Sequence, residues 1–291
     1  MGKLIRAIAG DGSVVAYVLD STDVVSRAEQ IHATSAVVTA ALGRLLTAAS
    51  MMGAMLKGEN SSLTLRVAGD GPAGSIIAVS DSSGNVRGYA GNAVVEIPLN
   101  EYGKLDVAGA VGRNGSVYVI KDLGLREPYV GQVPILSGEI AEDITGYFAT
   151  SEQVPTVCAL GVLVNPDLTV RAAGGFIAQL LPGADEDAIT KLETNLKGLD
   201  SVTQMLDKGM TPEDICNRVL DGMAPEILDE SDVLYRCGCT KARYEKALAA
   251  IGREELCDII EQDRQAEIVC HFCNQKYLFD EQELRVILAS S

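Results

Sequence analysis

The sequence has little positive charge, and this scarcity limits what the protein can bind. Its 291 residues hold 24 Lys and Arg against 40 Asp and Glu, a formal net charge of −16. A surface of this charge repels phosphate groups, whether they belong to a nucleic acid or to an anionic membrane. We therefore expect neither nucleic acid nor membrane as a partner.

The start of the chain lacks the pattern of a secretory signal. A signal peptide opens with a basic region followed by a long apolar run, whereas residues 1–8 alternate in polarity like a β-strand. This predicts a cytoplasmic protein. Because structural disulfides are rare in the reducing cytosol, paired cysteines in such a chain point to metal binding or redox chemistry.

Long apolar runs are also few. The longest, Ala36 to Leu56, contains Arg44 together with Thr39 and Thr47, and it is rich in Ala and Gly. A charge inside a membrane span is costly. We interpret the run as a core helix packed closely on a sheet.

The overall class predicted by composition and pattern is α+β. A hydrophobic content of 47% and a charged content of 22% provide enough apolar side chains for at least one core, and the length suggests two domains. Residues 1–184 are expected to form one domain of mixed α and β structure. Gly-rich turns such as 82–85 favour antiparallel strand pairs. The predicted strands are Leu4–Ala9, Val14–Leu19, Leu63–Val67, Ile76–Val79 and Val117–Ile120, and the predicted helices cover about 30–57 and 139–151.

One short segment imitates a dinucleotide-binding loop. Residues 69–74 match G-x-G-x-x-G directly after a predicted strand. However, Asp70 would repel an anion, Pro72 lacks an N–H group, and the residues that follow have the pattern of a strand. We therefore predict a hairpin turn.

Residues 185–230 have the pattern of a helical connector. Leu192, Leu196 and Leu199 follow helical spacing, but Gly198, Gly209 and Gly222 interrupt it, so short helices of low stability are expected. Thr211 followed by Pro212 is a good helix start. A second apolar helical face is predicted at Ile215, Val219, Leu220, Met223 and Ile227. With twelve acidic and four basic residues this connector carries a net charge of −8, which would favour its expansion once it is undocked.

Four of the seven cysteines lie in two close pairs near the C-terminus. These pairs are Cys237-Gly-Cys239 and Cys270-His-Phe-Cys273, and thirty residues lie between them. That distance allows two short helices to bring the pairs together around one tetrahedral ion, and four thiolates favour zinc. His271 is a competing ligand, although it fits better as a hydrogen-bond partner beside the site. The sequence thus predicts a small zinc-binding domain over 231–291.

The spacing of the first pair suggests that the site can be taken apart. A disulfide within C-x-C closes a small, strained ring that is readily reduced again, whereas a C-x-x-C disulfide forms more easily. Strong oxidation could therefore convert the ligands into disulfides and release the metal. Because binding free energy in a small metal site is largely folding free energy, oxidation would then become a conformational signal.

The remaining cysteines and the other histidine are not expected to be ligands. Cys158, Cys216 and Cys257 have apolar neighbours and are predicted to be buried, although Cys216 in the connector could be exposed and oxidised in an active form. His32 has no second metal-type ligand beside it, and we interpret it as a polar residue at a helix start.

The cysteine pairs and many other segments together resemble the heat shock protein 33 family. The second pair continues as Cys273-Asn-Gln-Lys-Tyr-Leu-Phe279, and matching segments extend through the first 184 residues. They include Ala41–Arg44, Leu63–Val67 with Gly69–Pro72, Lys121–Leu125, Gly131–Pro134, Ser137–Asp143, Ser151–Gln153, and Ala173–Phe176 through Leu180–Gly183. One departure is Ala36, where family members commonly have Pro.

The resemblance implies a redox-regulated, ATP-independent holdase chaperone. It implies a three-layer first domain around a mixed sheet, a metastable linker and a zinc switch with Cys237, Cys239, Cys270 and Cys273 as ligands of one Zn²⁺ per chain. In the active state it implies disulfides Cys237–Cys239 and Cys270–Cys273. The implied partners are unfolded client proteins, a second activated subunit in a homodimer, and ATP-driven foldases that receive the clients.

Two other functions remain to be compared with the switch. A thiol-disulfide oxidoreductase would use Cys270 and Cys273, but such enzymes place the first thiolate at a helix N-terminus, and residues 274–279 have the pattern of a turn and a strand. A constitutive zinc-ribbon module would fit the four ligands but not the acidic charge or the C-x-C spacing. We therefore expect a chaperone and not an enzyme.

Overall fold

Strands of alternating polarity form two five-stranded antiparallel sheets in the first part of the chain. The computed structural model describes residues 1–290, which fall into two compact units, unit 1 over Met1–Arg236 and unit 2 from Cys237 onward. The division into 1–184, 185–230 and 231–291 stays a prediction, and the residues of the predicted connector belong to unit 1.

The first sheet has the strand order β10-β1-β2-β9-β8, and the second has the order β5-β4-β3-β6-β7. The α+β class and the antiparallel pairing are confirmed. Two antiparallel sheets stand in place of the single mixed sheet that the resemblance implied, and among the described residues the parallel contact is an isolated bridge between Val86 and Tyr235. The strands are β1 Gly2–Ile8, β2 Val14–Asp20, β3 Ser62–Gly69, β4 Ile76–Asp81, β5 Val86–Ala90, β6 Gly115–Asp122, β7 Tyr129–Pro134, β8 Thr156–Val164, β9 Val170–Leu180 and β10 Glu226–Val233.

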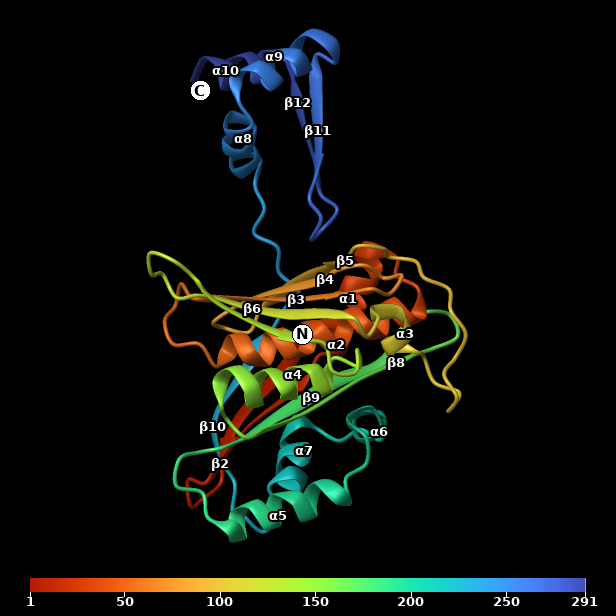
Figure 1. The fold of residues 1–291 in the computed structure, drawn as a ribbon, viewed down its shortest axis with the longest axis vertical. Helices are drawn as coiled ribbons and strands as arrows, with labels where there is room; N and C mark the ends of the chain where they lie inside the picture. The colour runs from red at the N-terminus through yellow and green to blue at the C-terminus, as the bar shows by residue number, and fades with distance from the viewer. Residues whose placement is uncertain (291) are drawn as a thin grey trace. The chain divides into compact units, whose positions relative to one another are not determined.

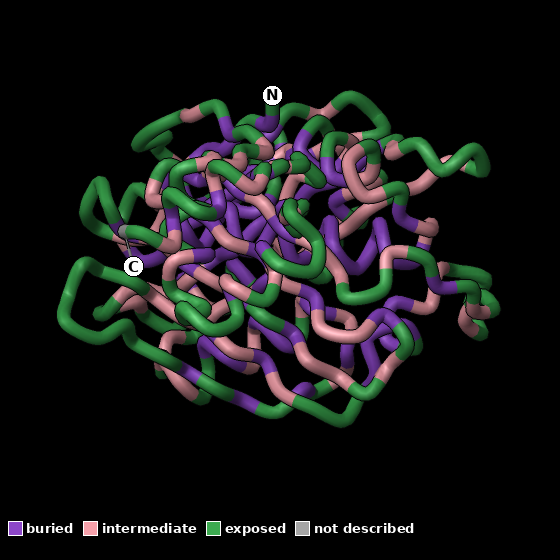
Figure 2. Tube along the Cα trace, turned by 90° about the horizontal axis from the view of Figure 1, so that it is seen from above, coloured by how far each residue is buried: buried purple, intermediate pink, exposed green. Residues whose placement is uncertain are grey.

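A layer of helices lies between the two sheets (Figure 1). It contains α1 Thr22–His32, α2 Ala36–Ala54, the short α3 Val107–Val111, and α4 Ala141–Tyr147, which continues as the π-helix η1 Phe148–Glu152. The central helix α2 contacts strands of both sheets. It is long and apolar enough to cross a membrane, but 89% of its most apolar window is buried, which supports the predicted core helix. Buried stretches of chain gather in the interior, with exposed loops around them (Figure 2).

The predicted helix over 30–57 is interrupted near its start. Ala33 adopts a left-handed conformation with φ of 49°, which ends α1 at His32, and α2 begins at Ala36. His32 is therefore the last residue of a helix, and its prediction as a helix-start residue is wrong. Its Nε2 lies 3.1 Å from the hydroxyl of Tyr235.

The segment that imitates a dinucleotide loop is the predicted hairpin turn between β3 and β4. The Gly71 N–H donates a 3.0 Å hydrogen bond to the Val111 carbonyl at the end of α3. A Cβ at Gly71 would lie 2.4 Å from the Ala110 carbonyl oxygen, so the close approach of two backbones requires glycine here. Asp70 accepts a hydrogen bond of 2.7 Å from Asn114.

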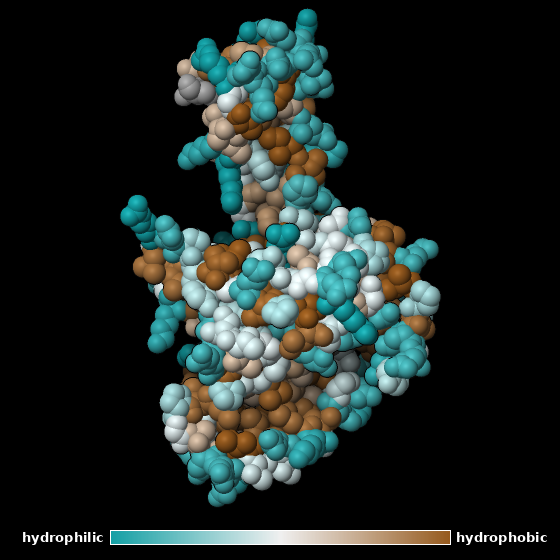
Figure 3. Space-filling model, viewed as in Figure 1, coloured by the Kyte–Doolittle hydropathy of each residue, from teal (hydrophilic) through white to brown (hydrophobic). Residues whose placement is uncertain are grey.

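Three short helices cover the outer face of the first sheet. They are α5 Glu186–Lys197, α6 Val202–Asp207 and α7 Pro212–Val219, and each begins with a side-chain cap, from Asp185, Ser201 and Thr211 respectively. The predicted apolar residues Ile215 and Val219 are buried against β1 and β2 in a separate core cluster. Apolar side chains also reach the surface where α5 and α7 meet this sheet (Figure 3).

The second helical face predicted in the connector ends earlier than expected. Ile227 lies on β10, not on a helix, and its side chain is 44% exposed. The chain turns at Gly222, whose φ is 70°, and Ala224, whose φ is 47°, and it then pairs with β1. Backbone pairing with a sheet edge therefore overrides the helical spacing of the apolar residues.

Unit 2 contains two helices, a hairpin and a final helix. The elements are α8 Lys241–Ala250, α9 Arg253–Gln262, β11 Gln265–Val269, β12 Lys276–Asp280 and α10 Glu281–Ser290. The two short helices expected between the cysteine pairs are α8 and α9. The core of this unit is small and consists of the buried residues Leu248, Leu256, Ile260, Phe279, Leu284 and Ile287.

Candidate metal centre

The two cysteine pairs meet at one place in unit 2. The Sγ atoms of Cys237, Cys239, Cys270 and Cys273 all lie within 4.8 Å of one another. Between the two pairs, the Sγ atoms of Cys237 and Cys270 lie 3.7 Å apart, and those of Cys239 and Cys273 lie 3.4 Å apart. A tetrahedral zinc ion with Zn–S bonds of about 2.3 Å requires sulphur separations of about 3.8 Å. The residues present therefore fit a four-thiolate zinc site.

The backbone positions each pair differently. Cys237 and Cys239 lie in the irregular segment before α8, whose first turn is capped by the Thr240 side chain. Cys270 and Cys273 lie in the tight turn between β11 and β12. In that turn the Cys270 N–H donates to the Gln275 carbonyl at 2.9 Å, and the Asn274 N–H donates to the Cys270 carbonyl at 2.8 Å.

The turn also bears on the oxidoreductase alternative. After Cys273 the chain passes through Asn274, which has a left-handed φ of 56°, and continues as β12. The predicted turn and strand are thus confirmed. Neither cysteine of the C-x-x-C pair lies at a helix N-terminus, where a thiolate nucleophile would be stabilised.

The surroundings of the thiols favour negative charge at Cys270. Burial raises the pKa of this thiol, but hydrogen bonds from Tyr244 and from the backbone N–H groups of Phe272 and Cys273 outweigh burial and lower it to about 6. Burial raises the pKa of Cys237 and of Cys273. Thiolates placed this close repel one another, and a divalent cation would relieve that repulsion.

Two tyrosines complete the surroundings of the cluster, and sequence reasoning did not assign them a role. The Tyr277 hydroxyl donates to the Cys239 carbonyl at 3.1 Å and lies 3.1 Å from its Sγ. This contact raises the pKa of Tyr277 to about 12. The rings of Tyr244 and Tyr277 lie 5.0 Å apart. Tyr277 lies four residues after the second cysteine pair, and this closeness in sequence is the feature from which its contact with the cluster could have been predicted.

His271 and the other cysteines lie outside the cluster. His271 is exposed, and the metal-binding group found among residues 1–290 consists of the four thiols. Cys158 and Cys216 are buried as predicted, and burial raises the pKa of Cys216 to about 11. Cys257 on α9 is only half-buried, so its predicted burial is wrong. The buried face of α9 is formed by Leu256 and Ile260, and Cys257 lies beside this face.

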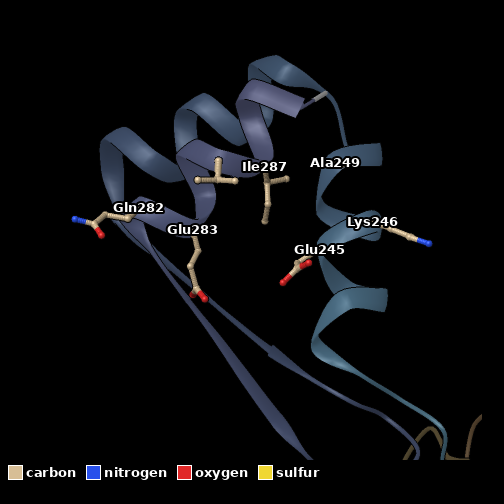
Figure 4. A pocket seen from close by; sticks show the side chains of 7 residues that line it. Glu245, Lys246, Ala249, Gln282, Glu283 and Ile287 are labelled. Atoms are coloured by element: carbon tan, nitrogen blue, oxygen red, sulfur yellow. The ribbon is translucent and has the colours of Figure 1, made fainter.

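Unit 2 also contains a cavity of about 640 Å³ between α8 and α10. Glu245, Lys246 and Ala249 line it from α8, and Gln282, Glu283 and Ile287 line it from α10 (Figure 4). No cysteine lines this cavity, so it does not belong to the thiol cluster.

The fold and the site together define an α+β protein whose small C-terminal unit carries a cluster of four thiols that could hold a metal ion. A model of the Hsp33 protein family matches residues 2–280. The chain is 54% identical over 285 residues to the 33 kDa chaperonin of Clostridioides difficile, covering 98% of both chains. It is 50% identical over 284 residues to the 33 kDa chaperonin of Bacillus subtilis, covering 98% of this chain and 97% of that one.

A solved structure agrees with these relatives. The crystal structure of the 33 kDa chaperonin (heat shock protein 33 homolog) from Thermotoga maritima superimposes with a TM-score of 0.91 at 37% sequence identity. The match covers 99% of this chain and 98% of that one. The chain belongs to the Hsp33 family of chaperones.

Proposed function

We propose that this protein is a redox-regulated, ATP-independent holdase of the cytoplasm that binds unfolded proteins under oxidative stress. The convergence of four thiols from two separate segments carries the proposal. In the reduced state Cys237, Cys239, Cys270 and Cys273 would hold one Zn²⁺ per chain. The bound ion would join the segment before α8 to the β11–β12 turn, and it would contribute directly to the folding free energy of unit 2.

Oxidation would remove the ligands. Two thiols that form one disulfide lose two electrons and two protons, and one hydrogen peroxide molecule is reduced to two water molecules. We assign the disulfides to Cys237–Cys239 and Cys270–Cys273, as the family resemblance implies. Thiols consumed in this way no longer bind Zn²⁺, so oxidation would release the ion and destabilise unit 2, whose core contains only six buried residues.

The signal would then reach the connector. Its helices α5, α6 and α7 are short, and their apolar faces cover the first sheet. When oxidation of Cys270 and Cys273 loosens unit 2, residues 185–230 would become less stable, and both events would expose apolar surface to unfolded clients. Activated subunits would form a homodimer and pass clients to ATP-driven foldases. The protein would act as a binding protein and not as an enzyme.

A tryptic map of the peroxide-treated chain tests the disulfide assignment. Cleavage after Arg236, Lys241, Arg264 and Lys276 places each cysteine pair in its own peptide, 237–241 and 265–276. The assigned disulfides therefore lie within single peptides, each lighter than its reduced form by the mass of two hydrogen atoms. A covalent link between the two peptides would contradict the assignment.

The same preparation separates a switch from an oxidoreductase. A switch releases zinc as the two disulfides form and does not turn over a disulfide substrate. An oxidoreductase would turn over such a substrate, and Cys273→Ser would trap mixed disulfides. Turnover with zinc retained would contradict the proposal.

A further inference from the structure

One segment closes an edge of both sheets in unit 1. We define the strap as Glu226–Arg236. Its first part is β10, which pairs with β1 at the edge of the first sheet. Its last part lies along β5 at the edge of the second sheet, where the Val86 N–H donates to the Leu234 carbonyl and the Arg236 N–H donates to the Val86 carbonyl, each at 2.9 Å.

Residues 226–232 of the strap are held to β1 by backbone pairing and ion pairs, whereas Val233 is fully buried in the main core of unit 1. Ile227 and Leu228 are 44% and 47% exposed, so little apolar area holds this part of the strap in place. On the β1 side Lys3 pairs with Glu230 and lies 3.4 Å from Asp232. Ion pairs between exposed side chains contribute little stability. Residues 226–232 can therefore be detached at a modest cost in free energy once Val233 and Tyr235 have left the main core.

Arg6 adds a second ion pair to the same edge. Its guanidinium lies 2.6 Å from the Asp229 carboxylate directly opposite on β10. The edge of β1 thus presents two basic side chains three residues apart, and the strap matches them with Asp229 and Asp232, also three apart. Strand pairing and charge complementarity together define which peptide fits this edge.

Tyr235 fastens the end of the strap together with the buried Val233 and a 3.1 Å hydrogen bond from the Leu234 N–H to Asn85 Oδ1. The Tyr235 hydroxyl donates to the Gly88 carbonyl at 2.8 Å and accepts from the Gly88 N–H at 3.3 Å. It also lies 3.1 Å from His32 Nε2, and its ring packs against the main core of unit 1. Only Arg236 lies between this anchor and Cys237, the first candidate ligand.

We propose that the β1 edge, once the strap has left it, binds an extended acidic segment of an unfolded client as an added β-strand. This inference rests on the proposed holdase function. A vacated edge presents unpaired N–H and C=O groups that an extended chain satisfies by strand addition. Lys3 and Arg6 select acidic side chains at the spacing that the strap itself has. The strap is thus an internal competitor of the client.

A labelled peptide with the sequence of residues 226–233 tests the site. Fluorescence anisotropy with the full chain should show binding after oxidation and no binding in the reduced, zinc-loaded state. Raised salt should weaken the complex, because its ion pairs are exposed. A peptide with Lys in place of each acidic residue should bind about tenfold more weakly or not at all. Equal binding of the two peptides would overturn the charge-matched site.

Backbone methylation distinguishes strand addition from side-chain contact alone. In an edge strand alternate N–H groups face the neighbouring strand, and the others face solvent. We compare one peptide N-methylated at Asp229 and Ser231 with another N-methylated at Glu230 and Asp232. One of the two should bind about tenfold more weakly or not at all, and the other should bind normally. Equal affinities of both methylated peptides would overturn the inference.

Substitutions in the protein provide a matched comparison. In the oxidised chain, Lys3→Glu with Arg6→Glu should weaken peptide binding about tenfold. Lys208→Glu removes an ion pair of similar exposure, to Asp200 on the connector, and should leave peptide binding unchanged. If both chains bind the peptide like the parent, the β1 edge is not the site.

A test on the reduced chain, without oxidant, distinguishes a failure of this inference from a failure of the proposed function. Tyr235→Ala removes the anchor, so the reduced chain should bind the peptide without oxidant, whereas Tyr102→Ala at a 76% exposed ring should not. If reduced Tyr235→Ala binds no peptide, the inference fails even where zinc release and client protection follow the proposal. If the peptide is excluded only when the oxidised chain is dimeric, the strap of a second copy occupies the edge, which contradicts the client assignment.

Discussion

The Tyr235 hydroxyl donates a 2.8 Å hydrogen bond to the Gly88 carbonyl, which fixes the chain to the edge of the second sheet two residues before Cys237. The anchor is an exchange of two hydrogen bonds, because the same hydroxyl also accepts from the Gly88 N–H. A side chain at Gly88 would lie 2.5 Å from the Ile77 carbonyl oxygen, so β5 can carry only glycine at this point. The anchor of the strap and Cys237, the first candidate ligand, are therefore separated by one residue along the chain.

Removing the Tyr235 hydroxyl should loosen the strap without leaving a cavity in the core. Tyr235→Phe keeps the ring but deletes the hydrogen bonds to Gly88, and we expect a loss of about 1–2 kcal/mol in unfolding free energy. Urea unfolding measures this loss, and limited proteolysis should show faster cleavage within 226–236. Tyr102→Phe, on a 76% exposed ring, is the matched control. Equal proteolysis rates in the two variants would refute the role of the anchor.

Replacing one candidate ligand should empty the metal centre. Cys270→Ser removes the thiol whose pKa is lowered to about 6 by Tyr244 and backbone hydrogen bonds against the effect of burial. The variant should lose zinc to a chelating dye that leaves the parent chain loaded, because three thiols no longer complete a structural site. Cys257→Ser is the control, since this half-buried thiol lies outside the cluster. Zinc retained by Cys270→Ser would contradict the ligand set.

Weakening one helix cap should lower the stability of the connector. The Thr211 side chain accepts a hydrogen bond from the Asp214 N–H, and the Asp214 carboxylate accepts one from the Thr211 N–H. Thr211→Ala should therefore destabilise α7 by about 1 kcal/mol. Hydrogen exchange should rise over 212–219, and client protection should begin at a lower peroxide concentration. Thr194→Ala, within α5, removes a hydroxyl that bonds only to the Thr190 carbonyl and serves as control. An unchanged peroxide threshold in Thr211→Ala would argue against the connector as part of the switch.

The polar cluster at the π-helix should make unit 1 acid-sensitive. Burial raises the pKa of Glu152, but hydrogen bonds from Lys121 and Tyr147 outweigh burial and hold it below the ordinary 4.5. A carboxyl with a lowered pKa in the folded state stabilises the fold above its unfolded value, and this stabilisation is lost as the pH falls through the folded value. Unfolding free energy should therefore drop more steeply below about pH 5 in the parent than in Glu152→Gln. Parallel pH curves for the two proteins would contradict this role.

The metal centre was the part of the molecule most open to prediction. Cys-x-Cys and Cys-x-x-Cys spacing predicts candidate ligands from local sequence alone, and the distance of 3.4 Å between Cys239 and Cys273 agrees with one shared site. Strand β6 was also predictable, because its central side chains alternate between a buried and a more exposed face, whereas β2 has four consecutive buried residues, 16–19, and was predictable as an apolar run rich in Val.

The parts that sequence reasoning missed depend on contacts between distant residues. Ile227 keeps helical spacing with Met223, yet pairing with Ala7 on β1 places it in a strand. Nothing local to His32 indicates its partner Tyr235, which lies 203 residues later. Tyr244 acquires its role only when α8 brings it beside Cys270. In each case tertiary pairing decides the outcome, and periodicity within one segment does not encode it.

The most direct test of the account follows zinc and client protection in the same samples. Peroxide is added at raised temperature, a metallochromic dye reports released zinc, and light scattering reports thermal aggregation of a client protein. We expect release of about one zinc per chain, with protection beginning as the zinc appears. Zinc retained under peroxide, with protection absent or indifferent to the oxidant, would contradict the redox switch and leave a purely structural metal centre.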